Sequence, residues 1–251
     1  MRRMVGVTLA ALALLTTAAC GSNAKELPKE EAVAAMAEKA DKAANYQVKL
    51  RLTAQVKSGS LVQSEETVEG AVEYIAKEDP DLHSSYVTTN KGSGKQGKTE
   101  LYKQGKLILS NENEQGWKDV SARLQKEELL KATHADLVEA LRKIESELSV
   151  EPREEGYSLS YSGESGNVYE AFKKPFTINF KGVDQSQVHS DLKTIVDKET
   201  LFIRELHYEA TANNAAQTVT LRVDLSYDQF NKINEVSIPQ EIREAASQPS
   251  K

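Results

Sequence analysis

The segment Gly92-Ser93-Gly94-Lys95-Gln96-Gly97-Lys98-Thr99 has residue types and spacing that match nucleotide phosphate binding. It satisfies both G-x-x-x-x-G-K-[ST] and G-x-G-x-x-G, the glycine-rich loops whose N–H groups hold phosphate. Such a loop needs a buried strand before it and a long helix starting near the lysine. Thr99–Lys103 instead alternates like a strand and stops at Gln104-Gly105. We therefore interpret the segment as a flexible hairpin loop and expect no nucleotide partner.

Four histidines and many carboxylates are the next candidates, for metal binding or acid–base catalysis. His83, His134, His189 and His207 form no ligand pair such as H-x-x-x-H, and the chain has one cysteine. Gly163-Glu164-Ser165-Gly166-Asn167 ends in Asn where the nucleophile motif G-x-S-x-G needs glycine. The sequence singles out no catalytic pair among 38 acidic residues. We predict scattered surface or half-buried histidines, no catalytic, cofactor-binding or metal-binding residues, and no enzyme activity.

Residues 1–19 have the features of a bacterial secretion signal. Arg2 and Arg3 give a positive start, and Met4–Leu15 is an unbroken run of apolar and small residues. A secretory apolar region has about 7–15 residues, whereas a membrane-spanning helix needs about 20. Residues 1–19 are therefore predicted to be a signal peptide that is removed on export.

Cys20, the only cysteine, follows this signal directly. Ala18-Ala19-Cys20-Gly21 resembles the bacterial lipobox, whose cysteine receives a diacylglyceryl group, although Thr17 stands where an aliphatic residue is usual. The alternative is an ordinary signal that happens to end near a cysteine. We predict lipidation of Cys20, a tether over residues 20–27, and anchoring to the extracytoplasmic face of the cell membrane.

The charge of the exported chain limits its partners. Once Arg2 and Arg3 are removed, 30 basic residues stand against 38 acidic ones, a formal charge of −8. An acidic exterior argues against nucleic acid as a partner. A single cysteine also excludes an internal disulfide.

Hydrophobic spacing predicts a helix, a run of strands, a helical middle and more strands. The first helix is expected over Pro28–Asn45, and the second over Gln125–Leu148 with a break or second cap at Thr133. The expected strands are Tyr46–Val56, Val68–Ile75, Leu82–Thr89, Thr99–Lys103, Lys106–Ser110, Trp117–Val120, Tyr157–Ser162, Ile195–Lys198, Leu201–Thr211, Thr218–Tyr227 and a short one near Val236–Ile238. The remaining segments are a charged linker, a short helix and a frayed end, at Glu151–Gly156, within Val183–Val196 and at Glu241–Lys251.

Successive antiparallel strands joined by short polar turns predict a meander. The order of elements favours an α+β fold, in which one strongly curved antiparallel sheet has helices covering its concave face. We expect a single domain over residues 28–245 and a flexible tail over residues 246–251.

Several segments resemble one group of lipoproteins. They are the signal with its lipobox, the helix before a long meander, Glu114–Asp119, Ser226–Asn231 and Ile238–Glu241. Together they resemble the small lipoproteins of Gram-positive bacteria that contain a domain of unknown function. These are similar in turn to the LolA/LppX-type lipoprotein carriers. The resemblance implies a half-open β-barrel capped by helices, with carriage of a lipid as the expected activity.

The aromatic residues leave two interpretations open. They either line a hydrophobic cavity inside the curved sheet or form a solid core between sheet and helices. The residues concerned are Tyr46, Tyr74, Tyr86, Tyr102, Trp117, Phe172, Phe176, Phe180, Tyr208 and Tyr227. A cavity of about 300 Å³ or more would favour a binding module for a hydrophobic or amphiphilic ligand. A solid core would favour an envelope scaffold or regulatory lipoprotein that binds another protein. The sequence alone assigns no ligand-binding residue.

Overall fold

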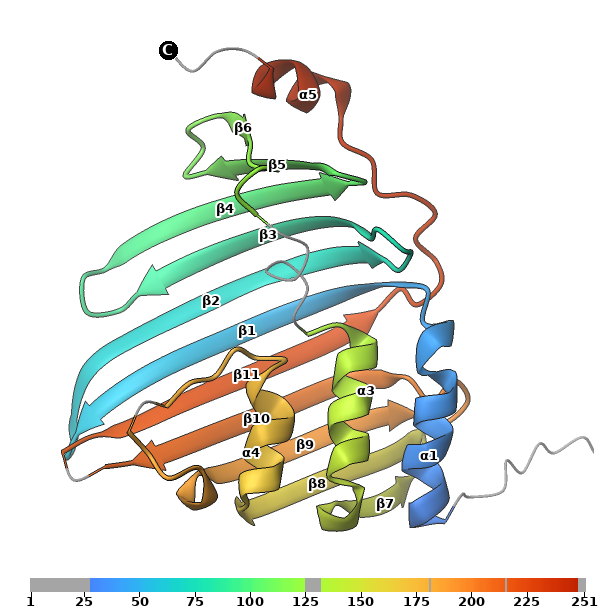
Figure 1. Cartoon of the computed structure of the whole chain (residues 1–251), viewed down its shortest axis with the longest axis vertical. Helices are drawn as coiled ribbons and strands as arrows, with labels where there is room; N and C mark the ends of the chain where they lie inside the picture. The colour runs from blue at the N-terminus through green and yellow to red at the C-terminus, as the bar shows by residue number, and fades with distance from the viewer. Residues whose placement is uncertain (1–27, 125–131, 181, 215, 248–251) are drawn as a thin grey trace, which may run out of the picture.

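The chain forms one long antiparallel sheet with a layer of helices on one face (Figure 1). This computed structural model describes residues 28–124, 132–180, 182–214 and 216–247, so the predicted signal and Cys20 lie outside the described residues. The helices are α1 (Lys29–Lys39), α3 (His134–Lys143), α4 (Gly166–Lys173) and α5 (Gln240–Ala246), with the 3-10 turns η1 (Ala40–Lys42), η2 (Glu145–Glu147) and η3 (Gln185–Gln187). The strands are β1 (Asn45–Ser58), β2 (Leu61–Ile75), β3 (Asp81–Asn90), β4 (Lys95–Gln104), β5 (Leu107–Glu112), β6 (Trp117–Asp119), β7 (Ser149–Arg153), β8 (Gly156–Glu164), β9 (His189–Asp197), β10 (Ile203–Asn213) and β11 (Thr218–Asp228).

The eleven strands lie in the order β6-β5-β4-β3-β2-β1-β11-β10-β9-β8-β7, with antiparallel pairing throughout. Two meanders meet at the centre of the sheet, where β1 pairs with β11 from Gln47↔Asp228 to Lys57↔Thr218. The outermost strands β6 and β7 do not pair with each other, so the sheet stays open. The predicted α+β fold with a strongly curved antiparallel sheet and helices on its concave face is confirmed.

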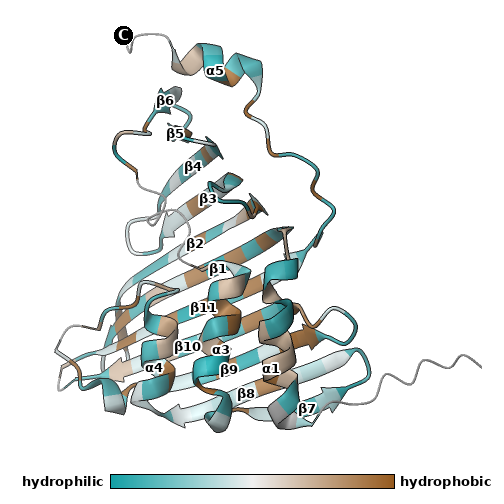
Figure 2. Ribbon diagram, turned by 45° about the vertical axis from the view of Figure 1, so that its right-hand side comes forward, coloured by the Kyte–Doolittle hydropathy of each residue, from teal (hydrophilic) through white to brown (hydrophobic). Residues whose placement is uncertain are grey.

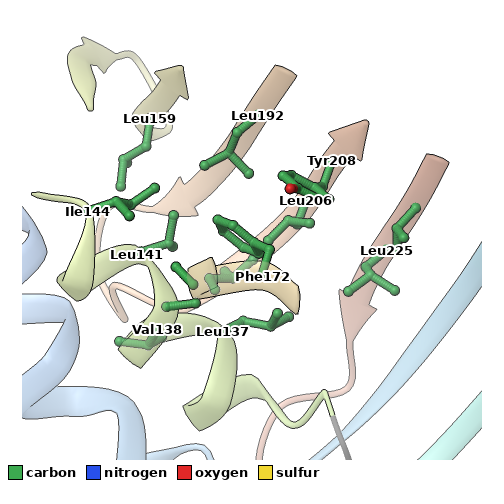
Figure 3. Packing of buried hydrophobic residues seen from close by; sticks show 14 of the residues in the cluster. Leu137, Val138, Leu141, Ile144, Leu159, Phe172, Leu192, Leu206, Tyr208 and Leu225 are labelled. Carbon is green, nitrogen blue, oxygen red and sulfur yellow. The ribbon is translucent and has the colours of Figure 1, made fainter. Parts of the chain in front are cut away.

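The period-two pattern of the strands decides which face carries the helices. In β1, Tyr46 and Val48 are buried, whereas Lys49 and Arg51 are exposed on the opposite face. Helices α1, α3 and α4 lie over the strands from β11 to β7 (Figure 1), and hydrophobic positions alternate with hydrophilic ones along the central strands (Figure 2). Residues that meet between these layers include Leu137 and Leu141 of α3, Ile144 just after it, Phe172 of α4, and Leu159, Leu192, Leu206 and Tyr208 of the sheet (Figure 3).

The other half of the sheet has a separate, smaller core. Leu82, Leu101, Ile108 and Val120 form this second cluster, and Leu124 packs against it. Val72 and Tyr74 of β2 contact both clusters. The two clusters therefore meet along the strand next to the centre of the sheet.

Helix α3 begins at a capping box. The Thr133 hydroxyl accepts from the N–H of Asp136 (3.2 Å), and the Asp136 carboxylate accepts from the N–H of Thr133 (3.1 Å). The cap predicted at Thr133 is confirmed, and the first described helical residue after it is His134; residues 125–131 of the expected helix lie outside the described part. Within the described ranges, no helix has the length and apolar character needed to cross a membrane.

Two predicted segments near the middle of the chain are wrong, and one helix was missed. The charged linker expected at Glu151–Gly156 is mostly edge strand β7 and the start of β8, because charged, exposed side chains are typical of an edge strand. The short helix expected within Val183–Val196 is only the three-residue turn η3, and β9 follows it. Helix α4 was not expected; Ser165, considered above only for the nucleophile motif, caps it, and its hydroxyl accepts from the N–H of Val168 (3.4 Å).

Both ends of the described chain also differ from expectation. The helix expected over Pro28–Asn45 ends at Lys39, with η1 after it, because Asn45 already pairs with Ile75 in the sheet. Val236 and Ile238 are buried in a connecting segment and form no strand. The frayed end expected from Glu241 is helix α5, which begins directly after Pro239, a residue suited to a helix start.

Candidate functional site

A half-enclosed cavity of about 360 Å³ lies between the sheet and the helix layer. We call it the inner cavity. Strands β1, β2, β3 and β11 form its floor, and the residues just before α3 and just after α4 form its cover. Its lining residues are Tyr46, Val48, Leu50, Leu52, Val72, Tyr74, Tyr86, Ala132, Thr133, Pro175, Thr177, Leu225 and Tyr227.

The strand register brings the floor residues together from distant parts of the sequence. Across β1 and β2, Tyr46 pairs with Tyr74 and Val48 pairs with Val72. On the other side of β1, Leu50 pairs with Leu225. Paired residues in neighbouring strands point to the same face of a sheet, so alternate positions of four strands make one continuous apolar floor.

The inner cavity carries no charged side chain in its lining. Burial raises the pKa of Tyr46 well above its usual value, although the N–H of His134 donating to its hydroxyl opposes the shift. Burial likewise raises the pKa of Tyr74, Tyr86 and Tyr227. All four phenols therefore stay protonated and neutral at physiological pH. The lining suits a hydrocarbon group and offers no ion pair to a charged one.

One end of the inner cavity is closed by an aromatic cluster. The Tyr46 ring lies 5.0 Å from Tyr74 and 5.4 Å from Tyr227, centroid to centroid. Phe230 packs against Tyr46 and Tyr227 at 5.7 and 6.0 Å. His134 completes the cluster, 5.8 Å from Tyr227. Ring contacts of this density make a rigid end wall.

Two hydrogen bonds hold His134, one from its own backbone N–H and one to its ring from the backbone of β10. Its N–H donates to the Tyr46 hydroxyl (3.1 Å), and its Nε2 accepts from the N–H of Ile203 (3.0 Å). Its Nδ1 has no hydrogen-bond partner in the part of the chain that the structure describes. Burial lowers the pKa of His134 to about 4, so the ring is neutral. His134 therefore stabilises the position of Tyr46.

Tyr86 forms a side wall of the inner cavity and lies against Gly70. A Cβ atom on Gly70 would come within 2.2 Å of the Ser85 carbonyl oxygen and within 2.5 Å of Tyr86 Cδ1, so only glycine fits at this position. Ser84, two residues before Tyr86 on the same face of β3, is buried and lowers the pKa of the Tyr86 phenol against the larger effect of burial. Ser84 pairs with Leu101 of the second cluster. Tyr86 is thus held between the inner cavity and the second cluster.

The opposite face of the sheet has a larger and more open groove of about 1070 Å³, which we call the outer groove. Its lining residues include charged side chains such as Lys49, Glu69 and Asp224, and several of the charged residues pair with each other. His207 Nδ1 lies 2.6 Å from Asp224, and Arg51 lies 3.1 Å from Glu69. A wide, hydrated surface with paired charges gives a small hydrophobic ligand little burial. The inner cavity is therefore the better candidate site.

The structure places the residues considered for chemistry as follows. The Gly92–Thr99 segment is a turn that leads into β4 at Lys95, as the hairpin interpretation predicted. His83, His189 and His207 are part-exposed, whereas His134 is buried, a position that no sequence pattern indicated. No group of three or more metal-ligating side chains occurs among the residues described. Cys20 lies outside them.

The aromatic residues divide between the two interpretations. Tyr46, Tyr74, Tyr86 and Tyr227 line the inner cavity. Others pack in the solid part of the core, where Phe172 stacks on Tyr208 at 4.7 Å. A third group lies on the outer face, and His83 stacks on Tyr102 there at 4.1 Å. The sheet therefore encloses both a packed core and a cavity.

Comparisons with known proteins place the chain in a family. A family of unknown function (DUF6612) matches residues 28–247, in agreement with the predicted resemblance. No curated protein matches the chain. Among solved structures, LprF from Mycobacterium bovis is similar with 10% identity and a TM-score of 0.42, covering 86% of this chain and 100% of LprF. A LolA superfamily protein from Nitrosomonas europaea is similar with 11% identity and a TM-score of 0.25, covering 84% of this chain and 96% of its own. These likenesses are too distant to support a function.

Proposed function

The chain belongs to DUF6612, a family of unknown function, and we propose that it binds a hydrophobic or amphiphilic ligand in the inner cavity without converting it. The observation that supports this proposal is the cavity itself: about 360 Å³, half-enclosed, apolar and without a charged lining residue. Ligand sites in proteins typically have volumes of about 300–1,000 Å³ and mostly apolar walls. A binding module of this kind needs no catalytic group.

The proposal includes attachment to the membrane. Residues 1–19 act as the signal, Cys20 carries the diacylglyceryl group, and residues 20–27 tether a single domain of residues 28–245 to the extracytoplasmic face, with residues 246–251 as a tail. A two-chain anchor holds a protein firmly at a bilayer. Metabolic labelling with radioactive palmitate tests this, because label should enter the intact chain and be absent from Cys20→Ala.

Ligand binding is tested on residues 21–251, since every residue of both clusters lies between Ala32 and Tyr227. Displacement of a fluorescent apolar probe such as N-phenylnaphthylamine reports occupancy of the inner cavity. Leu50→Trp places an indole in the cavity and should reduce probe binding at least tenfold. Val87→Trp is the matched control, because Val87 lies on the outer face of β3 and is already 39% exposed. Equal binding by both variants and the original chain would contradict the proposal.

A second candidate function is that of an envelope scaffold that binds another protein, and the outer groove favours it. Arg51→Glu reverses a charge in that groove and leaves the inner cavity unchanged. A loss of function in cells with Arg51→Glu, together with normal function of Leu50→Trp, would favour the scaffold. The opposite pattern is expected for a ligand-binding module.

A further inference from the structure

We propose that the inner cavity accepts one hydrocarbon chain of about 14 carbon atoms, and that Tyr86 sets this limit. The inference rests on the proposed function and specifies its ligand class, a single-chain amphiphile. It follows from the volume of the cavity, the charge of its lining and the position of one side wall.

The volume limits the ligand to one chain. An apolar cavity of about 150 Å³ holds benzene, or about 25 Å³ for each of six carbon atoms. At that density the inner cavity, with a volume of about 360 Å³, has room for about 14 carbon atoms. Two chains of about that length need about twice the volume at the same density. A two-chain lipid therefore leaves one chain outside.

The lining determines which part of the ligand enters. All lining side chains are uncharged, and burial keeps the tyrosine hydroxyls protonated. A charged head group inside would lose its hydration without an ion pair in return. Thr177 is the exposed member of the lining and therefore marks the mouth. The hydrocarbon chain enters there, and the head group stays in water beside Thr177.

Tyr86 closes the cavity toward the rest of the concave face. Its ring lies against Gly70, its partner across β2 and β3, on the same face of the sheet as the floor of the cavity. Beyond Ser84 lies Leu101, the nearest strand partner in the second cluster. Removing the ring would add a volume close to that of one benzene, about six carbon atoms. The accepted chain would then rise from about 14 to about 20 carbon atoms.

The test is a displacement series with saturated fatty acids of 8 to 20 carbons on residues 21–251. Each methylene that is buried adds about 0.8 kcal/mol, so affinity should rise about fourfold per carbon up to about 14 carbons and then stay level. In Tyr86→Ala the rise should continue to about 20 carbons. Tyr102→Ala removes a tyrosine from the outer face of the neighbouring strand and should keep the original limit.

Leu52→Phe provides a second measurement that does not depend on removing a wall. It adds about three carbon atoms to the lining, so the limit should fall to about 11 carbons. Affinity that rises past 18 carbons in the original chain, or an unchanged limit in both Tyr86→Ala and Leu52→Phe, would overturn this inference. A diacylglycerol that binds more tightly than the fatty acid with the same chain length would also overturn it, because both of its chains would then be buried. Failure of every fatty acid to displace the probe would instead reject the proposed ligand-binding function.

Discussion

Replacement of His134 by glutamine should remove a defined part of the pH dependence of stability. His134 is 1% exposed, and burial lowers its pKa from 6.5 to about 4. In the unfolded chain the ring gains a proton near pH 6.5, whereas in the folded chain it stays neutral. The unfolded state therefore binds more protons between these values, and the free energy of unfolding falls as the pH falls.

The size of this effect follows from the two pKa values. A difference of one unit between the pKa values of the folded and unfolded states corresponds to about 1.36 kcal/mol. The loss is therefore about 2 kcal/mol between pH 7 and pH 5, and reaches about 3 kcal/mol below pH 4. The His134 ring is buried, so solvent does not screen this effect.

The assay is urea unfolding at pH 7 and pH 5, with the slope of free energy against urea checked for constancy. In His134→Gln the side-chain oxygen can accept the N–H of Ile203, as Nε2 does in the original chain. The free energy of unfolding should change between pH 7 and pH 5 by about 2 kcal/mol less in this variant than in the original chain, since all other groups are the same in both. His189→Gln, at an exposed site, should keep the full difference. An equal difference in His134→Gln and the original chain would refute the reasoning.

Three further substitutions test contacts of the fold. Lys103→Met should lower the free energy of unfolding by about 1–3 kcal/mol in urea, because the buried carbonyl of Pro80, the part-buried carbonyl of Gly105 and Asp79 lose the donor that Nζ provides. Thr133→Ala should cost about 1 kcal/mol in the same assay, since the capping box is lost. Gly70→Val should cost at least about 1–3 kcal/mol in the same assay, because its Cβ atom meets the Ser85 carbonyl oxygen as well as the Tyr86 ring and forces β3 to shift; an unchanged free energy of unfolding would contradict this close approach.

Local patterns in the sequence predicted much of the sheet. β1 alternates apolar and polar residues over its whole length, and a period of two admits few alternatives. The cap at Thr133 was also predictable, since Asp136 stands three residues later and completes the box. Strand β7 was not, because Pro152 and the charges around it are typical of loops and of edge strands alike. Only its pairing with β8 distinguishes the two.

The inner cavity could be predicted only in part. Alternation showed that Tyr46 and Tyr227 face one side of their strands, but these residues are far apart in the sequence, and their contact depends on the order of the strands. Nor does alternation give the distance between sheet and cover. One signal was available: Gly70 interrupts an otherwise regular strand, and an isolated glycine in a strand often marks a close approach. It indicates the position against which Tyr86 packs.

The energetic cost of an empty cavity supports a role for it. Buried empty volume destabilises proteins by about 24 cal/mol per Å³. The inner cavity is half-enclosed, so a cost of this kind applies to its enclosed part. Water in the half-open part reduces this cost, but it gains few hydrogen bonds from an apolar lining. Larger side chains at Val48 or Val72 would fill the space without changing the pairing of the strands. Val48 and Val72, together with the fit of the Tyr86 ring against Gly70, therefore keep this space open, and larger side chains at the two valines should fill it and abolish probe binding if the proposed function is right.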